Sequence, residues 1–167
     1  MTHRRLTVAS PVGRLILVAD DDGLTHLMLA NADLASAGLD EDDVPEAPDD
    51  PVLAAAAEQL GEYFDGTRTA FDLPLHLEGN EFERDAWLAL GDIPYGETVS
   101  YAQQADAIGR HGAFRAVGSA NGRNPVAIIL PCHRVIGADG SLVGFGGGLD
   151  VKRALLDLEG GVQQLPF

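Results

Sequence analysis

The sequence has almost no cysteine and almost no lysine. Cys132 is the only cysteine among 167 residues, and Lys152 is the only lysine, beside ten arginines. A single thiol excludes an internal disulfide and a zinc site built from several cysteines, so we expect no metal and no cofactor. No apolar run approaches the roughly 20 residues that cross a bilayer, and no long apolar segment follows the basic residues at the start. These absences predict a cytoplasmic protein with no membrane partner.

The first half of the chain has the pattern of a small sheet followed by a helix. Asp50 and Pro51 suit the cap and the first turn of a helix that Gly66 ends. Residues 31–50 are expected to form a loop with a short strand or a helical piece. Before them, three short apolar runs separated by turn sequences predict an antiparallel meander. These runs are residues 6–9, 15–19 and 24–29.

The second half has the pattern of several short helices. An alternating apolar segment at residues 67–79, interrupted by Pro74, predicts an edge strand or an extended linker in front of them. Trp87, on the first of these helices, is interpreted as a core anchor. Four helices are predicted. The first follows a cap at Asn80, the second runs from Ser100 to Ile108, the third from Ala113 to Ala120, and the fourth from a cap at Asp150 to Glu159.

The two middle helices, joined by a glycine-containing turn, have the shape of a helix-turn-helix. The second of them has a nearly smooth surface of small residues, from which Arg115 is the one long group to project. A smooth helix suits close approach to a backbone or a groove. Tight packing between helices, with a solvated Arg115, would explain the same residues. The side chains expected to anchor this helix are Phe114, Val117 and Asn121.

The most reactive group in the chain, Cys132, lies in an apolar run and is followed by His133 and Arg134. A free thiol has a pKa of ~8.5, so a base or a positive charge must raise its thiolate fraction before the sulfur is a good nucleophile. Histidine and arginine suit that task. For this run alone, a cysteine that serves as a small core hydrophobe is an equal alternative.

Several motifs in one order surround this cysteine. Asn124-Pro125-Val126 precedes Pro131-Cys132-His133-Arg134-Val135, and the other motifs are Tyr95-Gly96, Val99-Ser100-Tyr101, Arg115-Ala116-Val117-Gly118 and Gly147-Gly148-Leu149. Together they resemble the O6-alkylguanine-DNA alkyltransferases, also called methylated-DNA-protein-cysteine methyltransferases. The resemblance runs from Phe82 to about Glu159. Because several motifs are far more specific than one, the chain is identified as a member of this family.

The resemblance implies an α+β fold in two domains. Residues 1–78 would form a small N-terminal α/β domain, RNase H-like, with a three-stranded antiparallel sheet and a helix. Residues 79–167 would form a mainly helical, winged helix-turn-helix-like domain that binds DNA and accepts the alkyl group. The assignment of the first domain depends mainly on the match in the second.

The implied activity is that of a methylated-DNA-[protein]-cysteine S-methyltransferase that acts once. The alkyl group of O6-alkylguanine, and of O4-alkylthymine, in duplex DNA would pass irreversibly to Cys132. His133 would be the base, acting through a water because consecutive side chains diverge, and Glu159 would orient its ring. Glu159 gains nothing from the helix dipole at its position, which suggests a specific partner. Asn124 would brace the turn before the thiol by hydrogen bonds to backbone.

The alkylated base lies in a stacked duplex, so the nucleotide must be flipped out to reach a thiol in a protein wall. The resemblance implies that Arg115 enters the stack in its place and that the Tyr101 phenol bonds the flipped purine. The residues implied to contact DNA or the base are Tyr101, Arg115, Ala116, Ser119, Val135 and Gly146. Two positions depart from the family pattern: Phe145 stands where many relatives have tyrosine, and Gly146 replaces a small polar residue or alanine, so the pocket rim would be looser.

The net charge of -15 is unusual for a protein that binds phosphates. Five arginines and twenty acids precede Ile93, whereas the remainder of the chain is neutral. We therefore expect the acidic part to be solvated surface and the neutral part to meet alkylated double-stranded DNA, with the protein acting as a monomer. Many acids with one lysine would suit a salty cytoplasm, such as that of a halophilic archaeon, although a high-GC bacterium can share this composition.

Two other functions would use the same residues. A lesion-binding, alkyltransferase-like module flips the base but transfers nothing, and such modules lack the cysteine that this chain has at Cys132. A cysteine hydrolase would use Cys132 and His133 with repeated turnover, but nothing in the sequence marks an oxyanion hole or a peptide groove. Alkyl transfer is the function that the sequence favours.

Overall fold

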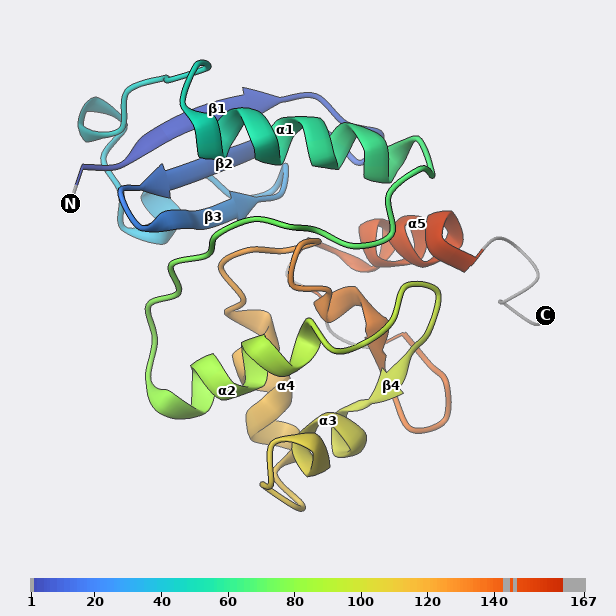
Figure 1. The fold of residues 1–167 in the computed structure, drawn as a ribbon. Helices are drawn as coiled ribbons and strands as arrows, with labels where there is room; N and C mark the ends of the chain where they lie inside the picture. The colour runs from blue at the N-terminus through green and yellow to red at the C-terminus, as the bar shows by residue number, and fades with distance from the viewer. Residues whose placement is uncertain (1, 143–144, 146, 161–167) are drawn as a thin grey trace. The chain divides into compact units, whose positions relative to one another are not determined.

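The structure is a computed structural model that describes residues 2–142, 145 and 147–160. A three-stranded antiparallel sheet forms early in the chain and helices dominate the rest, which confirms the predicted α+β class (Figure 1). Within the described residues, no helix is long and apolar enough to cross a bilayer. The chain divides into two compact units, Met1–Glu78 with Pro125–Ala127 and Gly79–Asn124 with Ile128–Phe167.

The first unit is a sheet with a helix on one face. It contains β1 (Arg4–Val8), β2 (Leu15–Asp20), β3 (Gly23–Met28), the 3-10 turns η1 (Ala35–Ala37) and η2 (Glu41–Asp43), and α1 (Pro51–Phe64). The strands pair antiparallel in chain order, as the meander predicted. Every residue of the middle strand, β2, is buried. Helix α1 covers one face of the sheet (Figure 1), and Leu34 and Val44 of the connecting segment pack on the other.

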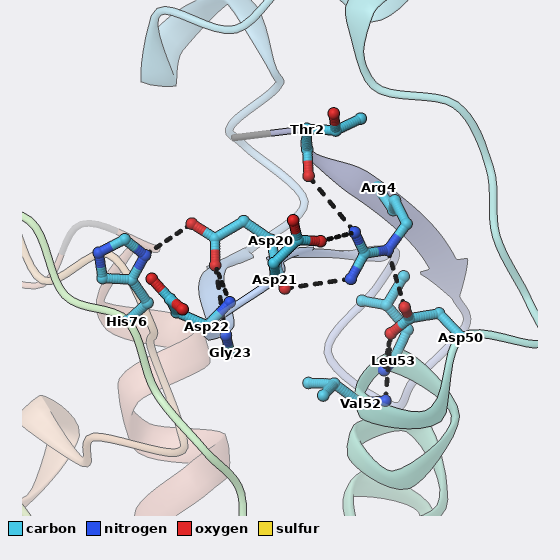
Figure 2. A network of polar contacts seen from close by, with 10 residues as sticks. All are labelled: Thr2, Arg4, Asp20, Asp21, Asp22, Gly23, Asp50, Val52, Leu53 and His76. Atoms are coloured by element: carbon cyan, nitrogen blue, oxygen red, sulfur yellow. Dashed lines mark hydrogen bonds and ion pairs between the residues drawn. The ribbon is translucent and has the colours of Figure 1, made fainter.

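Asp50 caps α1, as the sequence predicted. One of its carboxylate oxygens accepts hydrogen bonds from the amides of Val52 and Leu53, both at 3.1 Å. These amides lie in the first turn, where helices have no internal acceptors. Arg4 Nε donates to the other oxygen at 2.7 Å, and the same guanidinium reaches the carboxylate of Asp21 at 3.0 Å (Figure 2). One arginine therefore connects the start of α1 to the turn between β2 and β3.

The segment after α1 runs as an extended linker beside β3. Leu24 donates its amide to the Pro74 carbonyl at 2.8 Å and accepts from the His76 amide at 2.9 Å. This is a single bridge rather than a strand, because proline has no amide to continue the ladder. Gly23 is needed at this close approach, since its φ is 149° and a Cβ would lie 2.7 Å from the Pro74 oxygen.

A side-chain clasp fixes this linker to the turn between β2 and β3. The buried Asp20 accepts from the amides of Asp22 and Gly23 through one oxygen, and its other oxygen lies 2.6 Å from His76 Nδ1 (Figure 2). Burial acts to raise the pKa of Asp20, but the Asp22 amide and His76 outweigh it and the pKa is lowered. The hydrogen bond to Asp20 raises the pKa of His76. The clasp therefore favours a charged pair.

The second unit consists of short helices around a two-stranded parallel sheet. Its elements are α2 (Glu81–Leu90), β4 (Val99–Ser100), α3 (Tyr101–Ala107), α4 (Phe114–Gly122), η3 (Cys132–Arg134), β5 (Val135–Ile136) and α5 (Leu149–Gly160). Asn80 caps α2 and Ser100 caps α3, as predicted, and each is part of a capping box. The predicted cap of the last helix was wrong, because α5 starts one residue earlier. Asp150 therefore lies in the first turn of α5, where the helix dipole still stabilises its negative charge.

A polar core connects the helices of the helix-turn-helix. Trp87 of α2 is only 3% exposed and donates from Nε1 to the Ala120 carbonyl at 2.8 Å, which confirms it as a core anchor. The amides of Gln104 on α3 and Asn121 on α4 exchange two hydrogen bonds at 2.9 and 2.7 Å. Gln104 also donates to the carbonyl of Ala86 at 3.1 Å. These directional bonds fix how α3 and α4 pack.

The predicted anchoring of α4 is partly wrong. Val117 and Asn121 are buried as expected, but Phe114 is 46% exposed. Phe114 is the first residue of α4, and its ring lies 5.7 Å from the guanidinium carbon of Arg115. The start of α4 therefore presents an aromatic ring and a cation together on the surface.

Candidate active site

Tyr101 lies close enough to Cys132 for a charge on the sulfur to act on the Tyr101 hydroxyl. Tyr101 is the first residue after β4, and Cys132 precedes β5 by the single 3-10 turn η3. The parallel register pairs Val99 with Val135 and Ser100 with Ile136, so it ties the strand before Tyr101 to the strand that follows the cysteine turn. Burial, and then the negative charge available at Cys132, raise the pKa of the Tyr101 hydroxyl. The phenol therefore stays protonated and able to donate beside the sulfur.

Cys132 is buried, with 8% of its surface exposed. Burial raises the pKa of its thiol, and a hydrogen bond from Asn124 and the charge of Lys152 lower it only in part. Asn124 also donates from Nδ2 to the Leu130 carbonyl at 2.7 Å, the kind of backbone contact predicted for it. Ile128, in the same run, has a left-handed backbone with φ 72°, a strained conformation for a β-branched residue. Asn124 therefore contacts both the thiol and the backbone before it, but the buried sulfur needs help to ionise.

His133 has the protonation state that a base requires. Its Nε2 lies 2.6 Å from Glu159 Oε2, and because a carboxylate only accepts, Nε2 carries the proton. Nδ1 is left as the acceptor, and it has no hydrogen-bond partner among the described residues. Burial lowers the pKa of His133 despite the neighbouring Glu159. The ring is therefore neutral, with one nitrogen ready to take a proton.

Arg134 has a different role from the predicted one. The sequence placed it next to Cys132 as a charge that raises the thiolate fraction. In the structure its Nε and one terminal nitrogen donate to the two oxygens of Glu159, at 2.7 and 3.1 Å. The other terminal nitrogen donates to the Ile93 carbonyl at 2.6 Å. Arg134 therefore orients the carboxylate that faces His133, because its planar fork matches two oxygens at once.

Lys152 is a site residue that the sequence analysis did not single out. Its side chain is fully buried, and Nζ donates to the Val135 carbonyl at 2.6 Å. The signal was available in the sequence: it is the only lysine of the chain, and it lies two helical turns before Glu159 on the same stripe of α5. Its bond ends on the carbonyl of Val135, one of the positions predicted to line the base pocket.

The exposed residues of α4 form a second group. Arg115, Ala116 and Ser119 are all exposed, so the long Arg115 side chain projects beside small residues as expected, but the exposed Phe114 means that Arg115 is not the one long group there. Ser119 Oγ accepts from Arg123 at 2.6 Å, and Arg123 also pairs with Glu83 at 2.7 Å. The contact of these residues with DNA stays a prediction.

The structure therefore brings most predicted site residues into one place and leaves others apart. Gly146 lies outside the described residues. One group lies around the turn that carries the thiol and consists of Tyr101, Asn124, Cys132, His133, Val135 and Glu159. The other group lies on the exposed face of α4 and consists of Arg115, Ala116 and Ser119.

In the part of the chain that the structure describes, one group of side chains has atoms placed as metal ligands are. Ligand atoms of Asp20, Asp22 and His76 lie within 4.8 Å of one another. Both oxygens of Asp20 already accept hydrogen bonds, one from backbone amides and one from His76. The group is accounted for as the clasp that holds the linker of the first unit (Figure 2).

A buried thiol beside a neutral, carboxylate-bound histidine, in a unit that contains a helix-turn-helix, defines a DNA-binding class of protein with a nucleophilic cysteine. Comparison with known families agrees. Residues 81–161 match the DNA-binding domain, and residues 4–77 the ribonuclease-like domain, of 6-O-methylguanine DNA methyltransferase. The chain belongs to this family.

Individual relatives cover nearly the whole chain. A methylated-DNA–protein-cysteine methyltransferase of Mycolicibacterium paratuberculosis is 52% identical over 92% of this chain and 90% of its own. One of Methanosarcina barkeri is 45% identical over 91% and 94%. The crystal structure of Mycobacterium tuberculosis OGT in complex with DNA has a TM-score of 0.84 and 46% identity, and it covers 98% of this chain and 94% of its own.

Proposed function

We propose that the protein repairs O6-alkylguanine in duplex DNA by moving the alkyl group irreversibly to Cys132. The observation that carries this function is the arrangement of Cys132, His133 and Glu159, in which a buried thiol lies next to a neutral imidazole that is oriented by a carboxylate. The family membership and the relative solved with DNA support the substrate. O4-alkylthymine is a second substrate of the same chemistry.

The reaction is a displacement at the alkyl carbon. The thiol proton passes to His133 Nδ1 through a water, and the sulfur attacks the carbon as the bond from that carbon to guanine O6 breaks. The electron pair leaves with the oxygen, and the imidazolium of His133 then gives its proton to the guanine anion, so the products are S-alkylcysteine and unmodified guanine. Glu159 stabilises the transient imidazolium, and Arg134 holds Glu159 in place. Water does not cleave the thioether, so each molecule acts once.

DNA recognition is assigned to the helical part of the chain, residues 79–167, and residues 1–78 form the other domain. Arg115 enters the stack from the exposed face of α4, flanked by Ala116 and Ser119, which allow close approach. Tyr101 donates to the flipped purine, and the backbone of Val135 and of Gly146 lines the base pocket. Asn124 keeps the thiol turn in register with that pocket. The protein acts as a monomer in the cytoplasm, with DNA as its partner.

Intact-protein and peptide mass spectrometry after mixing with an O6-methylguanine duplex tests this function. One added methyl per molecule, located on Cys132, is expected, because the chain has one thiol and the product is stable. Cys132→Ser is expected to bind the duplex and leave it unrepaired. Repeated turnover would favour the hydrolase alternative, and a duplex bound by the wild type with no methyl transferred would favour the lesion-binding module.

A further inference from the structure

The two basic residues of α4 and its C-cap, Arg115 and Arg123, are in different states. Arg115 projects with no carboxylate paired to it among the described residues. Arg123, in contrast, is bound to an acid of α2, because its Nε donates to Oε2 of Glu83 at 2.7 Å. The mechanism proposed above gives this ion pair no role.

Three polar side chains form one line along the exposed side of α4. Arg115, Ser119 and Arg123 recur every four residues, so they lie on one side of the helix. Ser119 Oγ accepts from a terminal nitrogen of Arg123 at 2.6 Å, which turns the guanidinium back towards the preceding turn. The side chain of Arg123 is nevertheless 55% exposed. Its charge is therefore accessible on the side of α4 that is assigned to DNA.

The distance along α4 indicates which part of a duplex Arg123 would meet. Eight residues separate it from Arg115, which corresponds to ~12 Å along a helix. The minor groove is only ~6 Å wide, so a long side chain that far from the inserted Arg115 comes within reach of the phosphates that border the groove. A guanidinium offers a phosphate the same fork of donors that it offers a carboxylate. Arg123 is therefore suited in position and in chemistry to bind a backbone phosphate.

Glu83 is fixed where it neutralises that charge. It is the third residue of α2, and its Oε1 accepts from the Asn80 amide at 3.1 Å while its own amide donates to Asn80 Oδ1 at 2.8 Å. The capping box therefore holds the carboxylate and leaves its other oxygen to Arg123. The hydrogen bond from Arg123, and then that from the Asn80 amide, lower the pKa of Glu83. Glu83 is thus charged at neutral pH, and an approaching phosphate meets a pair with no net charge.

We propose that Arg123 is a further DNA-binding residue, and that a backbone phosphate replaces Glu83 on its guanidinium when DNA binds. This inference rests on the proposed repair of duplex DNA. Glu83 then acts as a competitor inside the protein, because breaking the pair offsets part of the free energy that the phosphate contact supplies. The chain has a net charge of -15, so one released arginine is a sizeable part of its attraction for phosphates.

A competitor and a structural brace predict effects of opposite sign for the same substitution. If the pair only braces α2 against α4, removing either partner loosens the DNA-binding helix and weakens binding. If Glu83 competes with DNA, removing its charge releases Arg123 and tightens binding, whereas removing Arg123 weakens it. Glu83→Gln separates the two roles, because a glutamine carbonyl can still accept from the Asn80 amide and keep the capping box.

The test measures binding to an O6-methylguanine duplex by fluorescence anisotropy from about 50 to 200 mM salt. Cys132→Ser is the parent, so that the duplex stays alkylated. Glu83→Gln is expected to tighten binding about two- to five-fold at the lowest salt, the range that an exposed ion pair represents. Arg123→Gln is expected to weaken binding and to reduce the slope of log affinity against log salt by about 1, as the loss of one phosphate contact does. Arg123→Lys, which keeps the charge, should keep the slope of the parent.

Glu81→Gln is the matched control, because it removes the same charge from the first turn of α2 at an exposed position with no arginine paired to it among the described residues. Three results overturn the inference: a Glu83→Gln affinity at or below that of the parent, equal tightening in Glu81→Gln, and an unchanged salt slope in Arg123→Gln. The first would make the pair a brace, the second would reflect net charge alone, and the third would mean that no phosphate contact was lost. A parent that does not bind the duplex even at the lowest salt would contradict the proposed function, and this inference with it.

Discussion

Glu159 is the residue on which the polar side chains of the site converge. It accepts from His133 through one oxygen and from Arg134 through both, and its side chain is 1% exposed. A buried carboxylate is stable only when its charge is matched, and here one arginine and one imidazole share that task. The orientation of the His133 ring therefore depends on Glu159 and, through Glu159, on Arg134.

Removing this support has a cost that can be measured. Arg134→Met leaves Glu159 buried without its cation and is expected to destabilise the fold by about 3–5 kcal/mol in denaturant unfolding. The surviving folded protein should also lose transfer from free O6-benzylguanine at low pH, because Arg134 lowers the pKa of His133 and its loss leaves the base protonated up to a higher pH. Arg153→Met, on the exposed side of α5, is the control and should stay within about 0.5 kcal/mol of wild type. A variant as stable as this control would remove Arg134 from the support of the site.

Arg115 acts at the same scale but on the substrate. Arg115→Ala is expected to keep the fold and the rate with free O6-benzylguanine, since a free base needs no flipping. Its rate on duplex DNA should fall at least about ten-fold, which corresponds to a loss of roughly 1.4 kcal/mol in the flipped state. Single-turnover transfer to both substrates measures this, with Arg68→Ala of the first unit as the control. Equal rates on the duplex would exclude insertion of Arg115 into the stack.

At the scale of elements, short connections decide where reactive groups lie. The two-residue strands β4 and β5 tie the segment before Tyr101 to the segment after the thiol turn, and the side-chain amides of Gln104 and Asn121 hold α3 against α4. In the first unit, the clasp of Asp20 and His76 fixes the linker to β3. Each of these contacts joins segments far apart in the sequence through one or two directional bonds.

The clasp predicts how stability of the fold depends on pH. The pKa of His76 is raised, so its contribution is complete below the unfolded value of ~6.5 and is lost as the pH rises through the folded value. The pKa of Asp20 is lowered, so its contribution is present above about 3.9 and is lost as the pH falls. His76→Gln is therefore expected to destabilise most between about pH 4 and 6.5 and least at pH 9, as measured by denaturant unfolding.

A matched control exists in the same chain. His111 lies 2.7 Å from Asp106 in a similar pair, but both side chains are largely exposed. Exposed ion pairs contribute little, so His111→Gln should hardly change the stability of the fold at pH 5.5 or at pH 9. A penalty for His76→Gln that is the same at pH 5.5 and pH 9 would mean that the ring contributes by packing and not by its charge.

At the scale of the whole molecule, the protein has a net charge of -15, and ion pairs offset part of the repulsion between its acidic side chains. An arginine pairs with one member of each acidic cluster, at residues 20–22, 41–43 and 49–50. Arg4 bridges Asp21 and Asp50 at 3.0 and 2.7 Å, and Arg5 pairs with Glu41 at 3.4 Å. Salt weakens these attractions as well as the repulsions, but the acids are in excess. The balance still favours stabilisation by salt.

A salt series tests this balance together with the hypothesis of a salty cytoplasm. At ~1 M salt the screening length is ~3 Å, so repulsion between the acidic clusters largely vanishes. We expect the melting temperature to rise from dilute buffer into the molar range of potassium chloride. We also expect methyl transfer to be retained, because DNA binding would depend on Arg115 insertion and base-pocket contacts as well as on phosphate contacts. A protein that is fully stable in dilute buffer and stops repairing DNA by half-molar salt would rule the hypothesis out.

The sequence by itself determined the reactive side chains, the family and most of the helices and strands. Capping residues such as Asn80 and Ser100 fix helix starts through bonds to amides a few residues away, so these starts can be predicted without a fold. Cys132 and His133 are adjacent, so their pairing could be proposed directly.

Only the tertiary structure decided which partner each buried charge has. Arg134 was expected to act on the neighbouring thiol, but it binds Glu159 on α5, and Lys152 reaches the thiol turn from that same helix. Ion pairs and buried hydrogen bonds depend on distances across the core, and these are set by how α5 packs against η3 rather than by any local pattern. The exposure of Phe114 has the same origin, because helical spacing fixes the face a residue occupies but not where the neighbouring helix ends.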